Sequence, residues 1–138
     1  MLAGCKKETK NSDNTSYTYY EVGFKNVTAN WRDSAFVVRT ADNSLIQQIE
    51  GQLALPVAQR KLVTGALMAG SGGYNRNATH EFKWHFKETD WNLADVTIEI
   101  YDGRAYSDID LNYDYWMGTV KRYGAWGSYI RRKLPGHP

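Results

Sequence analysis

Strictly alternating apolar and polar residues form the clearest pattern in the chain, between residues 80 and 103. The apolar positions of its two runs are Phe82, Trp84 and Phe86, then Val96, Ile98 and Ile100. Such alternation predicts two half-buried strands, because successive side chains of a strand point to opposite faces of a sheet. We expect the runs to pair as a hairpin whose long loop spans residues 87–95. Trp91, near the tip of that loop, then either covers the core or binds a ligand.

Other apolar runs predict the rest of the sheet. Residues typical of strands follow one another at 34–40, 61–69 and 128–134. The aromatic-rich segment 17–24 is either a first strand or a strap that lies over the domain.

Two segments have the spacing of amphipathic helices. Asp42 is a candidate N-cap for the first, in which apolar residues recur at helical intervals up to Leu53. Ser107 begins the second, with Asp110 at the acidic position of a capping box. The whole pattern predicts an α+β fold, with a mostly antiparallel sheet of about five strands and two helices packed on one face.

Length, charge and glycine content limit the number of domains and the kinds of partner and cofactor. A chain of 138 residues predicts one folded domain, which we place at residues 17–134 between a disordered tether at 1–16 and a flexible tail at 135–138. The net charge of +2 gives no strong attraction to nucleic acid, so no such partner is expected. The glycine cluster 70–73 lacks the Lys-Ser/Thr pair of a phosphate-binding loop, so no cofactor is expected.

The single cysteine suggests a lipid anchor. Cys5 ends the tetrapeptide Leu2-Ala3-Gly4-Cys5, which is typical of the site where bacterial lipoproteins are cleaved and acylated. The apolar stretch of the signal peptide would lie upstream of Leu2. Residues 6–16 are polar and suit a spacer. We therefore expect an extracytoplasmic protein of the bacterial cell envelope, attached to the membrane through Cys5; the alternative is a chance tetrapeptide.

One group of polar residues is a candidate catalytic site. If the hairpin forms, His85 and Glu99 share a face and lie within reach of a hydrogen bond, and Asp102 follows close by. A carboxylate that fixes the tautomer of an imidazole is what a general-base dyad requires. Alternation places Asp102 on the opposite face from Glu99, and the sequence offers no evident nucleophile. We favour a structural pair and keep the dyad as the alternative.

A metal site is not expected. With Cys5 assigned to the anchor, the folded part contains no thiol ligand. His80 and His85 are five residues apart in a strand pattern and should face opposite sides, while His137 lies in the tail.

Aromatic residues are the candidate ligand contacts. The candidates are Trp91, Tyr101, Trp126, Tyr74 and Tyr123. Such rings stack on sugars or anchor a peptide or protein partner, although in a small aromatic-rich domain most of them can equally complete the core.

Three motifs occur in an order that resembles a known family. They are Trp84-His85-Phe86, then Ile98-Glu99-Ile100-Tyr101-Asp102, then Trp126 with Ser128. Their order resembles the N-terminal domain of the slime-mould calmodulin-binding protein family, which has short secreted relatives in bacteria and fungi. The resemblance covers residues 34–134.

The resemblance carries expectations of its own. Tyr101 and Gly124 stand where the family has its two cysteines, which implies that this chain does without a disulfide of the family. The family also implies a compact secreted domain. The calmodulin name describes one lineage and is not carried over to a bacterial lipoprotein.

Together, these features predict a non-enzymatic, lipid-anchored binding or interaction domain with an unidentified protein, peptide or glycan ligand. A small envelope hydrolase that uses His85 and Glu99 is the first alternative. An inhibitor of a secreted enzyme is the second.

Overall fold

The structure is a computed structural model that describes residues 15–95 and 101–138. The predicted strand at 96–100, which contains Glu99, and the predicted lipid-attachment residue Cys5 both lie outside this part. The strands are β1 (Thr18–Phe24), β2 (Ala35–Thr40), β3 (Leu62–Ala69), β4 (Arg76–Asn77), β5 (His80–Glu81), β6 (Trp84–Ala94), β7 (Arg122–Gly124) and β8 (Ser128–Lys133). The helical segments are η2 (Trp31–Asp33), α1 (Asn43–Leu53), η3 (Val57–Gln59), η4 (Ala105–Asp110), α2 (Tyr113–Tyr115) and η5 (Trp116–Val120).

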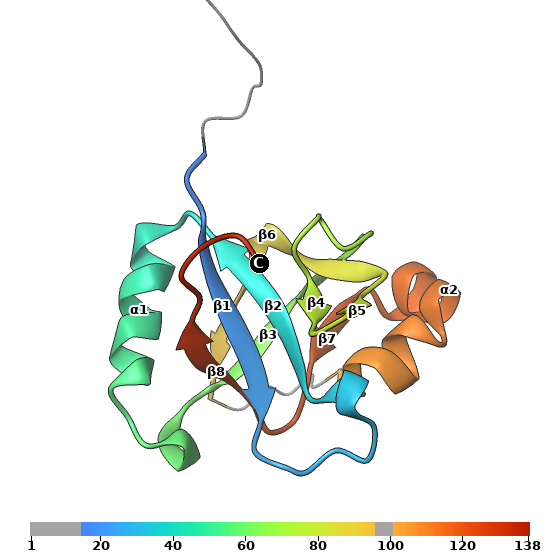
Figure 1. Ribbon diagram of the computed structural model, residues 1–138, viewed down its shortest axis with the longest axis horizontal. Coiled ribbons are helices and arrows are strands. Elements are labelled where there is room, and N and C mark those ends of the chain that lie inside the picture. Colours follow the sequence, from blue (N-terminus) through green and yellow to red (C-terminus); the bar gives the residue numbers. More distant parts are fainter. Residues whose placement is uncertain (1–14, 96–100) are drawn as a thin grey trace, which may run out of the picture.

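The first sheet places β1 between β2 and β8, with both neighbours antiparallel to it (Figure 1). The segment 17–24 therefore contains a central strand and is not a strap. Tyr20 pairs with Val38 and Val22 with Phe36, and all four side chains are buried. The alternation in β1 thus supplies one face of the core.

The second sheet places β3 between β6 and β7. Gly65 pairs with Trp91 but Leu67 pairs with Phe86, so the intervening residues of β6 form a bulge. The predicted loop at 87–95 is therefore wrong. Only the bulge leaves the sheet, because Trp91 buries its ring in the core and returns the chain to pairing with β3.

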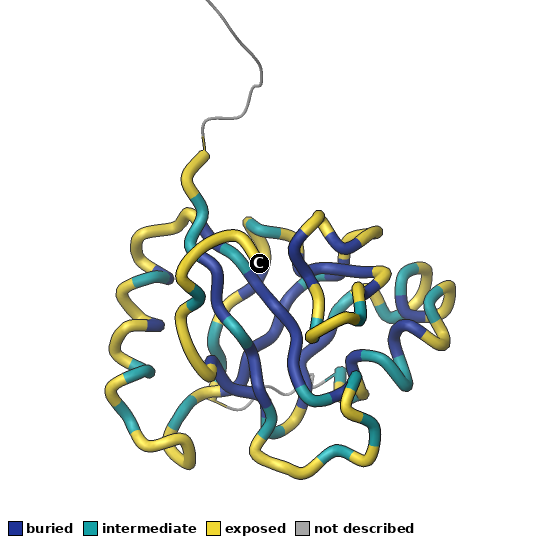
Figure 2. The backbone as a smooth tube through the Cα atoms, in the orientation of Figure 1, coloured by how far each residue is buried: buried dark blue, intermediate teal, exposed yellow. Residues whose placement is uncertain are grey.

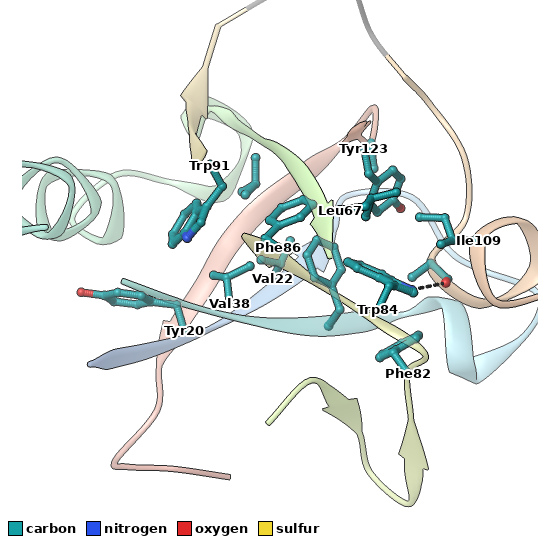
Figure 3. Packing of buried hydrophobic residues seen from close by; sticks show 14 of the residues in the cluster. Tyr20, Val22, Val38, Leu67, Phe82, Trp84, Phe86, Trp91, Ile109 and Tyr123 are labelled. Atoms are coloured by element: carbon teal, nitrogen blue, oxygen red, sulfur yellow. Dashed lines mark hydrogen bonds between the residues drawn. The ribbon is translucent and has the colours of Figure 1, made fainter. Parts of the chain in front are cut away.

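The core is an aromatic cluster built from both sheets. The ring of Phe36 from β2 lies 5.1 Å from Trp84 and 5.4 Å from Phe86, both of β6. The indole Nε1 of Trp84 donates to the carbonyl oxygen of Ala105 at 3.0 Å, which ties η4 to the sheet (Figure 3). The central strands are consequently buried along most of their length, as Figure 2 shows.

The first predicted helix is confirmed and the second is wrong in form. Asp42 Oδ1 accepts from the backbone N–H of Ser44 at 2.9 Å, the N-cap bond expected for α1. The second segment is helical but not one regular α-helix: η4 and η5 are π-helical and α2 is a single short α-helical segment. Asn112 interrupts it after η4, because its backbone is non-helical (φ −125°, ψ 43°). The described helices are all too short or too polar to cross a lipid bilayer.

The mixed fold with antiparallel sheets is confirmed, but its predicted packing is wrong. The described residues form eight strands, not about five, and these make three small sheets, of which β4 and β5 form the smallest. The helices do not share one face, since α1 and α2 lie on opposite sides of the molecule in Figure 1. Both larger sheets have a buried apolar face, and stacking those faces buries more apolar surface than extending one sheet would.

Candidate functional site

His85 lies on β6 and its side chain is largely buried. Its Nδ1 is 2.7 Å from the carbonyl oxygen of Gly70, so Nδ1–H donates to that oxygen. Its Nε2 is 3.8 Å from Oε1 of Glu88. The carboxylate near His85 is therefore Glu88, from the bulge of β6, whereas the predicted partner Glu99 lies outside the described residues.

Glu88 is the centre of a bonded group of side chains, which we name the Glu88 cluster (Arg39, Tyr74, His85 and Glu88). Glu88 Oε2 accepts from Arg39 Nε at 2.9 Å and from the Tyr74 hydroxyl at 3.2 Å. The Arg39 guanidinium also lies over the rings of Tyr17 and Tyr74, at 3.9 and 4.5 Å from their centroids. Burial, followed by the charge of Glu88, raises the pKa of Tyr74 well above its usual value. This arrangement is typical of a group that fixes neighbouring segments to one another.

A second histidine–carboxylate pair, His80 and Asp110, has no signal in the sequence. His80 Nε2 lies 2.7 Å from Oδ2 of the buried Asp110, and Asp110 Oδ1 accepts from the backbone N–H of Lys83 at 3.0 Å. The imidazole is held edge-on between Phe82 and Tyr106, with centroid distances of 4.8 and 4.9 Å. The sequence predicts Asp110 as a capping residue, and no local pattern connects it with a histidine thirty positions earlier. The pair attaches η4 to the β4–β5 hairpin.

The candidate aromatic residues divide into buried and exposed. Tyr74, Trp91 and Tyr123 are buried. The indole Nε1 of Trp91 donates to the backbone oxygen of Arg39 at 2.9 Å, so this residue covers the core, one of its two predicted roles. Tyr101 is partly buried against the same core. Trp126 keeps 55% of its surface exposed.

Trp126 borders an open pocket of about 560 Å³, which we name the Trp126 pocket. Its wall comes from the loop after β1, from residues 102–108 and from the turn between β7 and β8. Its lining includes Phe24, Val27, Asp33, Asp102, Gly103, Asp108 and Trp126. Segments distant in sequence therefore meet at one end of the sheets, on the lower side of Figure 1.

Two local features hold Trp126 at this position. Gly127 has a φ of +80°, a value that residues with a Cβ rarely adopt, and so permits the tight turn. The backbone N–H of Trp126 donates to Asp102 Oδ1 at 3.0 Å. Asp102, predicted as a possible companion of His85 and Glu99, thus belongs to this pocket and positions the exposed tryptophan.

Asp33 is a buried residue of the pocket lining and fixes the start of η4. Its Oδ1 accepts from the backbone N–H groups of Tyr106 and Ser107 at 2.9 and 2.8 Å, and its Oδ2 accepts from the Ser107 hydroxyl at 2.6 Å. Asp33 therefore caps the start of η4 from 73 positions away in the sequence. The sequence predicts Ser107 as the start of this helix, because a cap 73 positions away leaves no local signal.

The pocket carries a concentrated negative charge. The Tyr123 hydroxyl donates to the carbonyl oxygen of Gly103 at 2.9 Å, beneath the pocket wall. Burial raises the pKa of Tyr123 well above its usual value, and the charges of Asp102, Asp33 and Asp108 raise it further. These three carboxylates line the pocket together with one basic residue, Arg104.

The three histidines have different neighbours. His80 contacts Asp110, His85 contacts Glu88, and the ring of His137 lies 5.1 Å from that of Tyr19. In the described residues, no three side chains of His, Cys, Asp or Glu are grouped so that they could hold a metal ion.

Comparison with known proteins places the chain in a family. The family model of the BP-74 N-terminal domain matches residues 17–137, a longer span than the motifs alone indicated. No curated protein and no solved structure matches the chain. The family resemblance predicted from Trp84-His85-Phe86 and Trp126 is thereby confirmed. The chain belongs to the BP-74 N-terminal domain family.

Proposed function

We propose that this chain is a binding domain, lipid-anchored through Cys5 outside the bacterial cytoplasm, whose ligand site is the Trp126 pocket. The observation that carries the proposal is the exposure of Trp126 at the rim of the pocket, while three other candidate aromatics are buried. Large exposed aromatic rings beside a concave surface are typical of recognition sites. The ligand is a protein, peptide or glycan.

The position of the pocket suits a tethered domain. The chain enters β1 at Thr18, and Phe24 at the other end of β1 lines the pocket. At a rise of about 3.3 Å per residue, the two ends of this strand are roughly 20 Å apart. Thr18 and Phe24 therefore lie at opposite ends of β1 (Figure 1), and a tether attached before Thr18 would leave the pocket facing away from the membrane.

Replacing the tryptophan tests the ligand site. The wild-type chain, Trp126→Ala and Trp31→Ala are applied to a glycan array and to an immobilised peptide library. Trp31 is a matched control, because its side chain is 45% exposed and it does not line the pocket. We expect Trp126→Ala to weaken binding of the wild-type ligands by at least about tenfold and Trp31→Ala to leave it unchanged. Equal binding of wild type and Trp126→Ala would remove the pocket as the site.

A separate experiment tests the anchor. The chain is expressed in a bacterial host behind an apolar signal stretch and labelled with an alkyne fatty acid. We expect label in the membrane fraction for the wild-type chain and none for Cys5→Ser. A wild-type chain that stays unlabelled would contradict lipid attachment without affecting the ligand site.

A further inference from the structure

Apolar side chains stand on the rim of the Trp126 pocket. Val27, in the loop after β1, is fully exposed, and Trp126 is more than half exposed. Both line the pocket together with Phe24 and Ala29. Figure 2 shows most of the loop after β1 as exposed. The rim therefore offers apolar contacts to a ligand that extends beyond the pocket itself.

The charge of the pocket is opposite in sign to that of the chain. The chain has a formal net charge of +2. Among the described residues that line the pocket, three are acidic, Asp33, Asp102 and Asp108, and one is basic, Arg104. The pocket therefore favours a cationic ligand by charge complementarity.

Two of the carboxylates are fixed in place and keep capacity to accept further hydrogen bonds. Asp102 uses Oδ1 for the backbone N–H of Trp126, and Asp108 uses Oδ2 for the backbone N–H of Arg104 at 2.6 Å. An ionised carboxylate has about four acceptor positions, so one such bond leaves most of them for a ligand. Because backbone N–H groups already hold these carboxylates, the two side chains lose little conformational entropy when a ligand binds.

We propose that the Trp126 pocket binds an arginine side chain within an extended segment of a partner polypeptide. The planar guanidinium would lie against the Trp126 ring and donate to Asp102 and Asp108, since it combines a flat face with several directed N–H groups. A polypeptide fits better than a small amine, because the pocket volume of about 560 Å³ falls in the range for ligands larger than one side chain. The exposed Val27 extends the contact to residues beside the arginine. This inference rests on the proposed binding function.

A peptide library provides the test. The probes are acetylated and amidated heptapeptides, in which each position in turn carries one fixed residue. The best binder is resynthesised with citrulline in place of arginine, which keeps the shape and removes the charge. Affinities are measured by calorimetry with the whole chain, and argininamide serves as the small-amine probe.

We expect libraries with a fixed arginine to be enriched, and the citrulline peptide to bind at least about tenfold more weakly. The double variant Asp102→Asn/Asp108→Asn and the single variant Trp126→Ala should each lose a similar factor. Raising the salt concentration from about 50 to about 300 mM should weaken wild-type binding and affect the double variant less. The asparagines retain an oxygen for the backbone bonds, and equal thermal melting of the variants verifies their folding.

The control variant is Asp114→Asn, which removes an acidic side chain outside the pocket. Its affinity should equal that of the wild type. Equal binding of the arginine and citrulline peptides, or an equal loss in Asp114→Asn, would overturn the inference. If argininamide bound as tightly as the peptide, the inference that the partner is a polypeptide would be wrong. Glycan binding that depends on Trp126, without enrichment of arginine, would overturn this inference and leave the proposed function standing.

Discussion

The Glu88 cluster and the Trp126 pocket both gather aromatic and charged side chains, but they use them differently. In the Glu88 cluster, the carboxylate of Glu88 is bonded to Arg39 and Tyr74 and lies near His85. In the pocket, Asp102 and Asp108 are each held by one backbone N–H, and the ring of Trp126 is exposed. The first arrangement satisfies its polar groups internally, whereas the second leaves acceptors and apolar surface for another molecule.

This difference shows why a histidine near a carboxylate is weak support for a site. In the sequence, His85 lies among alternating aromatic residues and is therefore a candidate for a site. Its imidazole bonds to the carbonyl oxygen of Gly70, and its ring lies 5.7 Å from that of Tyr74. Substitutions in the cluster should therefore change folding stability, whereas substitutions in the pocket should change binding.

The largest effect is expected at Asn75, which is fully buried beside the Glu88 cluster. Its Oδ1 accepts from the backbone N–H of Val37 at 2.8 Å, and its Nδ2 donates to the carbonyl oxygen of Trp84 at 2.8 Å, so it joins β2 to β6. Asn75→Ala leaves two buried backbone groups without partners and should lower the free energy of unfolding by about 2 to 5 kcal/mol. Asn26→Ala, in the pocket, should change it by less than about 0.5 kcal/mol. Urea denaturation measures both, and similar losses would contradict the division between the two regions.

A smaller effect is expected at Glu88. Glu88→Gln removes the charge that Arg39 faces, and the loss should be about 1 to 2 kcal/mol, because both side chains remain partly exposed to solvent. Asp90 provides the control, since it belongs to the same bulge and pairs with Arg122 at the surface. Asp90→Asn should cost less than about 0.5 kcal/mol. If denaturation gave equal losses for the two variants, the cluster would be no more than another surface ion pair.

The smallest effects on folding stability are expected at two buried tyrosines, Tyr123 and Tyr20. Tyr123 donates to Gly103, and Tyr123→Phe should cost about 1 kcal/mol. The Tyr20 hydroxyl is buried without a hydrogen-bond partner among the described residues, and it points away from the ring cluster in Figure 3. Tyr20→Phe should therefore leave stability unchanged or raise it slightly. A loss at Tyr20 as large as that at Tyr123 would contradict this assignment.

The same tyrosines predict how stability depends on alkaline pH. Burial, with a further contribution from Glu50, raises the pKa of Tyr20 to about 12, and burial also raises the pKa of Tyr123. Tyrosines in the unfolded chain ionise near pH 10, so the folded state is favoured fully below about pH 10. This stabilisation is lost as the pH rises from about 10 through the raised pKa values of these tyrosines in the folded state. Denaturation at several alkaline pH values should show a shallower decline for Tyr20→Phe than for the wild type.

Local sequence determined several elements correctly. The alternation at Phe82, Trp84 and Phe86 predicted the buried face of the strand region, and Asp42 predicted the start of α1. Both signals are local, because the period of a strand and the N-cap bond involve only residues a few positions apart. The family was also recognisable, since its motifs are short stretches of sequence.

Tertiary structure decided where β6 ends and which residues surround each functional candidate. Trp91 lies on a strand, and not at the tip of a loop, because the core provides a space for its ring and β3 provides a partner. Asp33 caps η4 and Asp110 holds His80 over sequence separations that no local pattern spans. The Trp126 pocket is likewise assembled from three distant segments. The sequence by itself could determine the elements and the family, because those depend on neighbouring residues, whereas the partners of each polar group depend on how the two sheets stack.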